Sequence, residues 1–161
     1  IQALYPKHKV ISGGHTRKES SFKGLMQCPK STKKVLIHDA ARAFVNHEII
    51  DRCIKGLESS DAISTAISVF DTVVKVKHGV IIEIPNRNMI FLEQTPQAFN
   101  YKVILAAHKE ITTDATDDIT LAKEYGIECT IVQGSSKNFK VTTPQDFKLA
   151  QFLIKGNKWK E

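Results

Sequence analysis

Residues 35–42 read Val-Leu-Ile-His-Asp-Ala-Ala-Arg, a short apolar run that ends in an acidic residue. The run is too short for a helix and predicts a buried strand over residues 35–38. Asp39 then stands at the carboxyl end of that strand, followed by two small residues and Arg42. This stretch decides the fold, because the segments on both sides of it continue an alternation of strands and helices.

The flanking segments supply the alternating elements. We expect helices over residues 18–25, 48–57, 102–108 and 117–125, and further strands over residues 9–11, 61–69 and 127–132. A last helix has clear end signals: Thr143 is its N-cap, Pro144 its first residue, Asp146 lies in its first turn and Gly156 ends it. Alternation of this kind predicts an α/β fold, a mostly parallel sheet covered by helices.

A different pattern interrupts the alternation after residue 70. Residues 72–76 and 80–84 are β-branched runs separated by Lys77-His78-Gly79, which predicts a hairpin with a three-residue connection. Pro85-Asn86 ends the hairpin. We expect Thr95-Pro96-Gln97 to form a rigid turn before the next helix.

Length and composition restrict the class of protein. The 161 residues are enough for one domain, and 42% of them are hydrophobic, with no apolar run long enough for a membrane span. The three cysteines form no CxxC pair, so neither zinc nor a disulfide is indicated, and a cytoplasmic location is expected. The net charge of +6 is spread without a nucleic-acid-binding motif, so we expect neither nucleic acid nor membrane as a partner.

Candidate binding residues stand where strands are expected to end. In open α/β sheets ligands bind outside the carboxyl ends of the strands, which places Gly13-Gly14, Asp39 and the loop after residue 132 at one site. A glycine turn that leads into a helix binds anions, although it can equally be only a tight turn.

Asp39 is a candidate ligand for a hard cation that carries phosphates, and Arg42 is a candidate phosphate contact. The alternative is an Asp39–Arg42 ion pair that serves only the fold, and His38 is expected to be hydrogen-bonded rather than catalytic. Lys140 is a candidate point charge on a reacting phosphate, or else a surface lysine.

Taken in order, these segments resemble one family. The matching motifs are Gly13-Gly14-x-x-Arg17-x-x-Ser20-x-x-x-Gly24-Leu25, His38-Asp39-Ala40-Ala41-Arg42, Asp71-Thr72, Thr95-Pro96-Gln97-Ala98-Phe99, Thr116-Asp117-Asp118 and Gly134-x-x-x-Asn138-x-Lys140-x-Thr142-x-Pro144-x-Asp146. From Val10 to about Ile154, the chain is similar to the 2-C-methyl-D-erythritol 4-phosphate cytidylyltransferase family.

The resemblance implies a Rossmann-like three-layer sandwich of the nucleotide-diphospho-sugar transferase type, a single domain over residues 1–161. It implies binding of CTP and Mg²⁺, and a homodimer formed through a projecting hairpin arm over about residues 71–93. Its site residues follow by position: Gly14, Ser20, Asp39 and Ala40 for the nucleotide, Asp39 also for the metal, Arg42, Thr72, Thr95 and Thr116 for the sugar phosphate, and Lys140 and Arg87 to orient the substrate phosphate.

The implied reaction joins CTP to methylerythritol phosphate with release of pyrophosphate, a step in non-mevalonate isoprenoid biosynthesis. The family's N-terminal glycine-rich loop has no match here, so this polypeptide alone is expected to be inactive. Two alternatives stay open: a ribitol-5-phosphate cytidylyltransferase, and a non-catalytic domain that dimerises or binds nucleotide.

Overall fold

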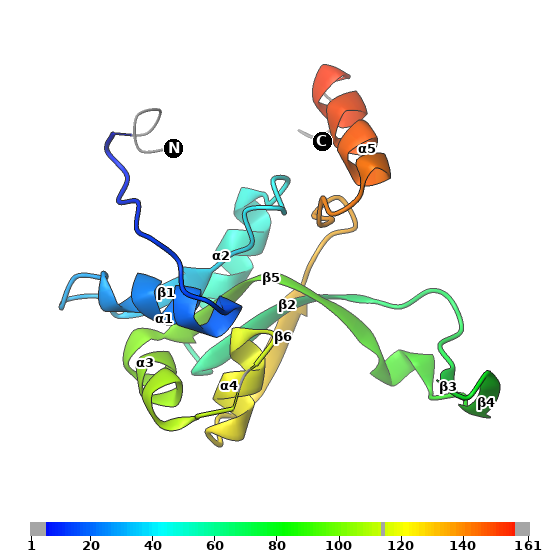
Figure 1. The fold of residues 1–161 in the computed structure, drawn as a ribbon, viewed down its shortest axis with the longest axis horizontal. Coiled ribbons are helices and arrows are strands. Elements are labelled where there is room, and N and C mark those ends of the chain that lie inside the picture. Colours follow the sequence, from blue (N-terminus) through cyan, green and yellow to red (C-terminus); the bar gives the residue numbers. More distant parts are fainter. Residues whose placement is uncertain (1–5, 114, 157–161) are drawn as a thin grey trace.

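The computed structural model describes residues 6–113 and 115–156. In this part of the chain, the central sheet has the strand order β1 (Lys34–Ile37), β5 (Phe91–Asn100), β2 (Ala62–Ser68) and β6 (Cys129–Gln133) (Figure 1). β2 and β6 are parallel, and β5 runs antiparallel to both β1 and β2. The prediction of a mostly parallel sheet is therefore confirmed by the shared direction of β1, β2 and β6, with β5 as the reversed strand.

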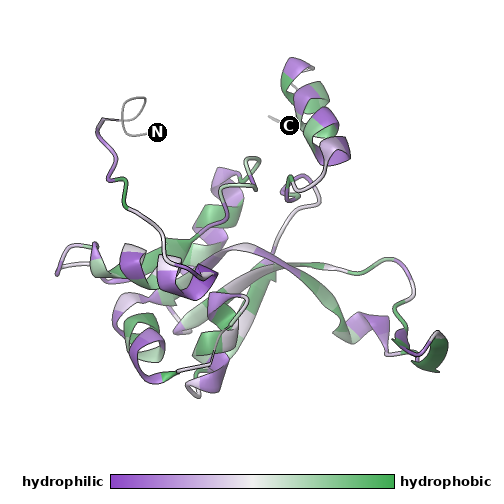
Figure 2. Ribbon diagram, viewed as in Figure 1, coloured by the Kyte–Doolittle hydropathy of each residue, from purple (hydrophilic) through white to green (hydrophobic). Residues whose placement is uncertain are grey.

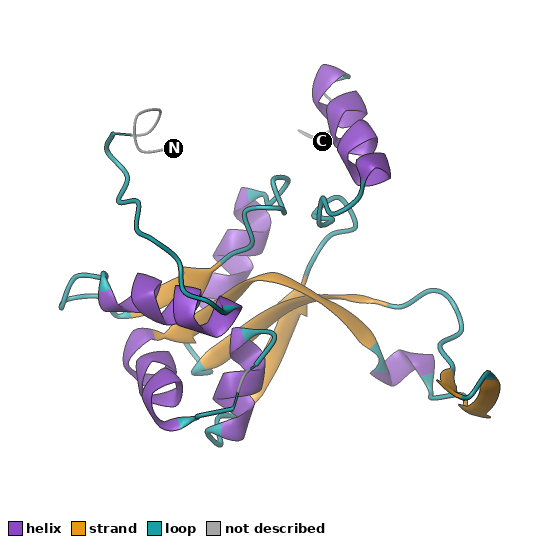
Figure 3. Ribbon diagram, viewed as in Figure 1, coloured by secondary structure: helices purple, strands orange, loops and turns teal. Residues whose placement is uncertain are grey.

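Helices cover both faces of the sheet, as Figure 3 shows. α1 (Arg17–Met26), α3 (Tyr101–Glu110) and α4 (Asp118–Glu124) share one apolar cluster with the sheet, whose members include Leu25, Ile104 and Phe99. α2 (His47–Gly56) packs on the other face, where Ile49 and Cys53 meet Ile63 and Ala98. Apolar residues buried on both sheet faces define the three layers that the sequence predicted.

Two local predictions are wrong. Residues 9–11 form no strand, and Val10 and Ile11 are 44% and 38% exposed on a segment that leads away from the sheet (Figure 1). A strand of three residues is stable only when it pairs with another strand. In the described sheet, β1 is an edge strand that pairs with β5 alone, so residues 9–11 have no strand partner there.

The predicted turn at residues 95–97 is instead the middle of β5, which runs from Phe91 to Asn100. Its pairing with β2 shifts between Ser64, which lies opposite Gln97, and Thr65, which lies opposite Gln94. Pro96 therefore lies in an irregular part of the ladder, where its missing N–H costs no pairing. A strand can contain proline at a bulge, where no hydrogen bond from its nitrogen is needed. The local sequence did not reveal that bulge.

The hairpin extends from the body of the molecule as a separate two-stranded sheet, β3 (Lys75–Lys77) and β4 (Val80–Glu83), followed by the short 3₁₀ helix η1 (Arg87–Met89) (Figure 1). The hairpin is confirmed, but its connection has two residues rather than three. His78 and Gly79 both have positive φ, 49° and 81°, which is the combination a tight two-residue hairpin turn needs.

The last helix, α5 (Pro144–Lys155), begins as predicted. The Thr143 side chain accepts a hydrogen bond from the Asp146 amide, and Asp146 bonds back to the Thr143 amide, which completes a capping box. The helix lies apart from the sheet, and its apolar residues Phe147 and Phe152 are 57% and 60% exposed (Figures 1 and 2). The pattern predicted the helix correctly, although its apolar side is largely uncovered in the described chain.

Candidate active site

A cavity of about 280 Å³ opens where β1 ends, beside the middle of β5 and the loops before α4 and α5. Its lining brings together residues from distant parts of the sequence: Arg17, Asp39, Arg42, Glu93, Gln94, Thr95, Gln97, Thr116, Asp117 and Lys140. The sequence placed Gly13-Gly14, Asp39 and the loop after residue 132 at one site. The structure brings Asp39 and that loop together, but Gly13-Gly14 does not line the cavity. We refer to this cavity as the cationic pocket, because Arg17, Arg42 and Lys140 all line it, beside an equal number of carboxylates.

Asp39 lies close to two of the cations in the cationic pocket. Its Oδ2 lies 3.0 Å from Lys140 Nζ and 3.7 Å from Arg42 Nε. The Arg42 side chain is only 13% exposed, and burial lowers its pKa while the Asp39 carboxylate partly restores it. One carboxylate therefore holds two cations toward the same opening, an arrangement that suits an anionic ligand such as a phosphate.

The fold fixes these side chains through hydrogen bonds to neighbouring backbone. Arg42 donates to the carbonyl oxygens of Asn138 and Glu93, at 2.9 and 3.3 Å. The Asp39 amide donates to Thr95 Oγ1 at 2.9 Å, and the loop carrying Lys140 is joined to the strand end by a bond from the Val141 amide to the Ala41 carbonyl. These bonds lock the turn over residues 39–42, which includes Ala40, against β5 and the loop before α5.

His38 takes no position in the cavity lining. Its Nδ1 lies 3.0 Å from Thr95 Oγ1 and its Nε2 lies 3.0 Å from the Arg42 carbonyl oxygen. Because a carbonyl oxygen only accepts, Nε2 donates and Nδ1 accepts from the threonine hydroxyl. Both ring nitrogens are used within the fold, which agrees with a hydrogen-bonded rather than a catalytic histidine.

The glycine turn lies next to the cationic pocket and does not line it. The Gly14 amide donates to Ser20 Oγ at 2.9 Å, so the two residues expected to hold a nucleotide are joined to each other at the start of α1. A side chain at residue 14 would collide with Glu19, whose Cβ lies only 2.1 Å from the position a Gly14 Cβ would take. Close approach therefore requires glycine here.

Arg17 connects that turn to the cationic pocket, although the sequence analysis assigned it no role beyond a motif position. Its guanidinium lies 2.6 Å from Asp118 Oδ2, and Asp118 Oδ1 lies 2.8 Å from His108 Nε2. The side chains of Asp118 and His108 are fully buried. Burial alone would raise the pKa of Asp118, but bonds from His108 and Arg17 outweigh it and hold that pKa below its ordinary value.

Glu93 is a second pocket residue that sequence reasoning missed. Its Oε1 accepts hydrogen bonds from Ser64 Oγ and, at 3.0 Å, from Gln97 Nε2. Partial burial of the carboxylate raises its pKa, and nearby Asp117 adds to the rise. No local pattern marks Glu93, because it is one residue in a strand whose partner across the sheet is distant in sequence.

Of the other predicted residues, Thr95 and Thr116 line the cationic pocket and the arm residues do not. Thr72 lies in the segment before β3, and Arg87 lies in η1, where it donates to the Phe70 carbonyl oxygen at 2.9 Å. The arm carries both away from the body of their own chain (Figure 1). Their expected role depends on a second protomer.

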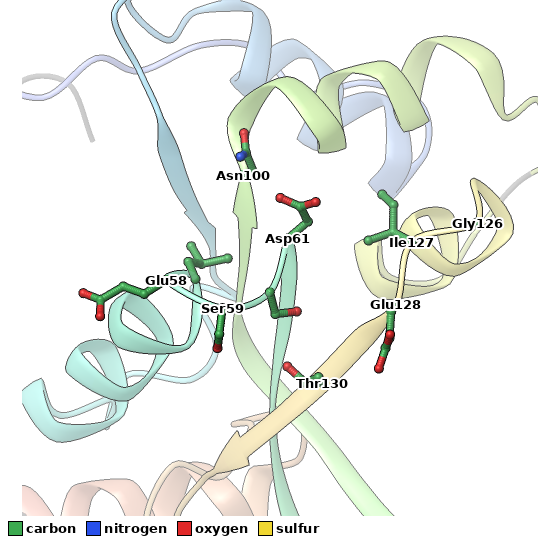
Figure 4. A pocket seen from close by; sticks show the side chains of 10 residues that line it. Glu58, Ser59, Asp61, Asn100, Gly126, Ile127, Glu128 and Thr130 are labelled. Atoms are coloured by element: carbon green, nitrogen blue, oxygen red, sulfur yellow. The ribbon is translucent and has the colours of Figure 1, made fainter.

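A larger cavity of about 680 Å³ lies at the opposite edge of the sheet, where β2 and β6 begin (Figure 4). Three carboxylates line it, from Glu58, Asp61 and Glu128. Such a lining repels phosphates, so size alone does not identify the site. The cationic pocket is the better candidate, because it has three cations that can contact a phosphate, whereas no Lys or Arg lines the larger cavity, and because it lies at the end of β1.

A helix-covered α/β sheet with a pocket at a strand end places the chain in the class of α/β proteins that bind ligands outside the carboxyl ends of their strands. The chain belongs to one family of that class: the model of IspD, 2-C-methyl-D-erythritol 4-phosphate cytidylyltransferase, matches residues 1–156. Among relatives of the same name, that of Prochlorococcus marinus (strain MIT 9301) is 41% identical over 155 residues, which cover 92% of this chain and 70% of the relative.

Solved structures give the same result. The 4-diphosphocytidyl-2C-methyl-D-erythritol synthase of Anaerococcus prevotii superposes with a TM-score of 0.87 at 29% identity, covering 96% of this chain and 75% of that one. The 2-C-methyl-D-erythritol 4-phosphate cytidylyltransferase of Thermus thermophilus gives 0.81 at 31% identity, covering 90% and 72%. The resemblance that the motifs indicated is confirmed.

Proposed function

We propose that this chain is a CTP-dependent cytidylyltransferase that acts on 2-C-methyl-D-erythritol 4-phosphate in isoprenoid biosynthesis. The observation that carries the proposal is the meeting of Asp39, Arg42 and Lys140 in one pocket at the carboxyl end of β1. The names of the family and its relatives support methylerythritol phosphate as the acceptor over ribitol phosphate.

The proposed reaction is an in-line displacement. An oxygen of the substrate phosphate attacks the α-phosphorus of CTP, a new P–O bond forms, and the bond to the departing pyrophosphate breaks. Such a transfer asks for positioning and charge neutralisation rather than a protein nucleophile. Lys140 and Arg42 would hold the attacking phosphate, while the amides of the Gly14 turn and Ser20 would contact the nucleotide.

The pocket also fits the metal that such a transfer uses. Both ion pairs of Asp39 engage Oδ2, and among the described residues no hydrogen bond to Oδ1 is recorded, so Oδ1 would be the oxygen that binds the metal. Mg²⁺ is commonly bound by one or two carboxylates together with substrate phosphates, so a single carboxylate fits it. When bound, the ion would neutralise charge on the CTP phosphates. The described residues contain no group of three or more His, Cys, Asp or Glu that could hold a metal without substrate.

We further propose a homodimer formed through the arm. Its strands expose apolar side chains on a projecting two-stranded sheet, with Val76, Ile81 and Ile82 each more than half exposed. A second arm or a partner's body would cover them and bring Thr72 and Arg87 toward the partner's cationic pocket.

A cytoplasmic location agrees with the three free cysteines. None of the helices in residues 6–113 and 115–156 is long and apolar enough to cross a bilayer.

Calorimetric titration tests the proposal. Methylerythritol 4-phosphate and ribitol 5-phosphate are titrated separately into the chain with CTP and Mg²⁺, and pyrophosphate release is followed in parallel. We expect preferential binding of the methylerythritol compound, weakened on the order of tenfold by Lys140→Ala through loss of a charge-assisted contact. Lys148→Ala, an exposed lysine of α5, is the matched control and should change nothing.

Each alternative has its own result. Preference for ribitol 5-phosphate would keep the mechanism and change the pathway. Release of pyrophosphate would refute a non-catalytic nucleotide-binding domain. If neither phosphate binds, the proposed site is wrong.

A further inference from the structure

Glu93 lines the cationic pocket, and hydrogen bonds within the fold hold one of its two carboxylate oxygens. Ser64 is 4% and Gln97 is 1% exposed, so the two donors that hold Oε1 are themselves locked by packing. The structure records no hydrogen bond or ion pair at Oε2 among the described residues, although Glu93 lines the cavity. The side chain is therefore a positioned acceptor with one open oxygen.

The surroundings make this carboxylate unusual. Glu93 is exposed although both donors to its Oε1 are buried, so its other oxygen can meet molecules that enter the cavity. The cations that line the same cavity are otherwise engaged: Lys140 and Arg42 lie near Asp39, and Arg17 lies on Asp118. None of these cations forms an ion pair with Glu93 in the described chain. Oε2 is therefore free to accept a hydrogen bond from a group that enters the cavity.

The chemistry of the proposed substrate supplies such donors. A phosphate dianion has only acceptor oxygens, so it would be repelled by the Glu93 carboxylate and attracted to Lys140 and Arg42. A sugar-alcohol phosphate also carries hydroxyl groups, each of which can donate. The cavity thus offers cations to the phosphate and a carboxylate acceptor to the hydroxyl groups.

We propose that Glu93 is a specificity-determining residue that accepts hydrogen bonds from hydroxyl groups of the sugar-alcohol phosphate through Oε2. The inference rests on the proposed function and adds to it the feature by which the site distinguishes a polyol phosphate from any other phosphate. Hydrogen bonds to charged groups correspond to a preference on the order of 10- to 100-fold.

Glu93→Gln is the most direct test, because it replaces one acceptor oxygen by a donor group and keeps the shape of the side chain. The new amide oxygen must take the place of Oε1 to accept from Ser64 and Gln97, which puts an NH₂ group where Oε2 was. The experiment measures dissociation constants by calorimetry for methylerythritol 4-phosphate and for propyl phosphate, which has no hydroxyl group. Glu58→Gln, in the acidic cavity at the opposite edge of the sheet, is the matched control.

We expect the unsubstituted chain to bind methylerythritol 4-phosphate more tightly than propyl phosphate. Glu93→Gln should weaken the first on the order of 10- to 100-fold and leave the second unchanged or tighter, because a repelling charge is gone. Equal weakening of both ligands, or no effect on either, would overturn the role of Glu93. If the unsubstituted chain bound neither, the proposed function itself would fail, and binding without preference for the polyol would refute Glu93 alone.

Discussion

Gly14 and Gly24 belong to the same sequence motif, but only one of them has neighbours that exclude a side chain. Gly14 lies where an added Cβ would meet Glu19, with the Glu19 backbone carbon only 3.0 Å away. Gly24 lies inside α1, where an added Cβ would meet nothing within 4 Å. The space around each glycine decides whether a side chain can be accommodated there, and the sequence does not show that space.

Alanine substitution separates the two glycines. Gly14→Ala should lower the free energy of unfolding by roughly 1–3 kcal/mol, because overpacking forces the turn and α1 apart. Gly24→Ala should raise it by about 0.5–1 kcal/mol, because alanine loses less backbone entropy in a helix. Urea denaturation measures both, and a similar change in the two variants would contradict this reading of the turn.

Arg42 acts through the shape of its side chain as well as its charge. Arg42→Lys keeps the charge, but an ammonium cannot bridge the Asn138 and Glu93 carbonyls in the guanidinium geometry. We expect roughly tenfold weaker binding of methylerythritol 4-phosphate by calorimetry, the equivalent of one lost hydrogen bond to a charged group. Arg52→Lys makes the same change in α2, outside the cationic pocket, and unchanged affinity in both variants would show that charge alone suffices.

Among the elements, α5 shows how much of a helix is specified locally. Thr143, Pro144 and Asp146 predicted its start from four residues of sequence, and the structure has the capping box there. Capping depends on neighbours along the chain, which are present whatever the tertiary fold. The exposed apolar side of the same helix was not predictable, because burial depends on what packs against it.

The capping box makes the start of α5 sensitive to acid. Hydrogen bonds from the Thr142 and Thr143 amides lower the pKa of Asp146 from 3.8 to about 2. A lowered folded-state pKa means that the carboxylate stabilises the helix above about pH 4 and loses that contribution as the pH falls toward about 2. Circular dichroism should show a loss of helix over this range that Asp146→Asn no longer shows, whereas Asp51→Asn in α2 should behave like the unsubstituted chain.

At the level of the whole molecule, the buried Asp118 ties three helices into one body. It lies at the start of α4, contacts Arg17 of α1 and His108 of α3, and its side chain is fully buried. Asp118→Ala should lower the free energy of unfolding by about 3 kcal/mol, because it removes the carboxylate that the buried His108 and the partly exposed Arg17 share. The exposed Asp51→Ala should have little effect by the same urea denaturation, and equal costs would show that the cluster contributes nothing specific.

The arm makes a prediction about assembly. Ile82→Asp places a charge on its exposed apolar surface, so we expect a dimer in analytical ultracentrifugation of the unsubstituted chain to become a monomer. Lys77→Glu, at the polar tip of the hairpin, is the matched charge control and should leave the dimer intact. A monomer before substitution would refute the arm as the interface.

The sequence was sufficient where neighbours along the chain decide the outcome. Helix periodicity, the cap at Thr143 and the turn of the hairpin are local, and all were predicted within a residue or two. The order and spacing of the motifs also identified the family, since each motif is a short contiguous pattern.

Only the tertiary structure decided what depends on distant partners. Residues 9–11 form no strand because a strand needs a neighbour, and Pro96 continues one because the ladder with β2 shifts beside it. The pairing of Arg17 with Asp118, 101 residues away, and the two donors on Glu93 were likewise invisible in sequence. Pairing, burial and charge compensation are set by contacts across the fold, so these residues acquired their roles only when the chain brought them together.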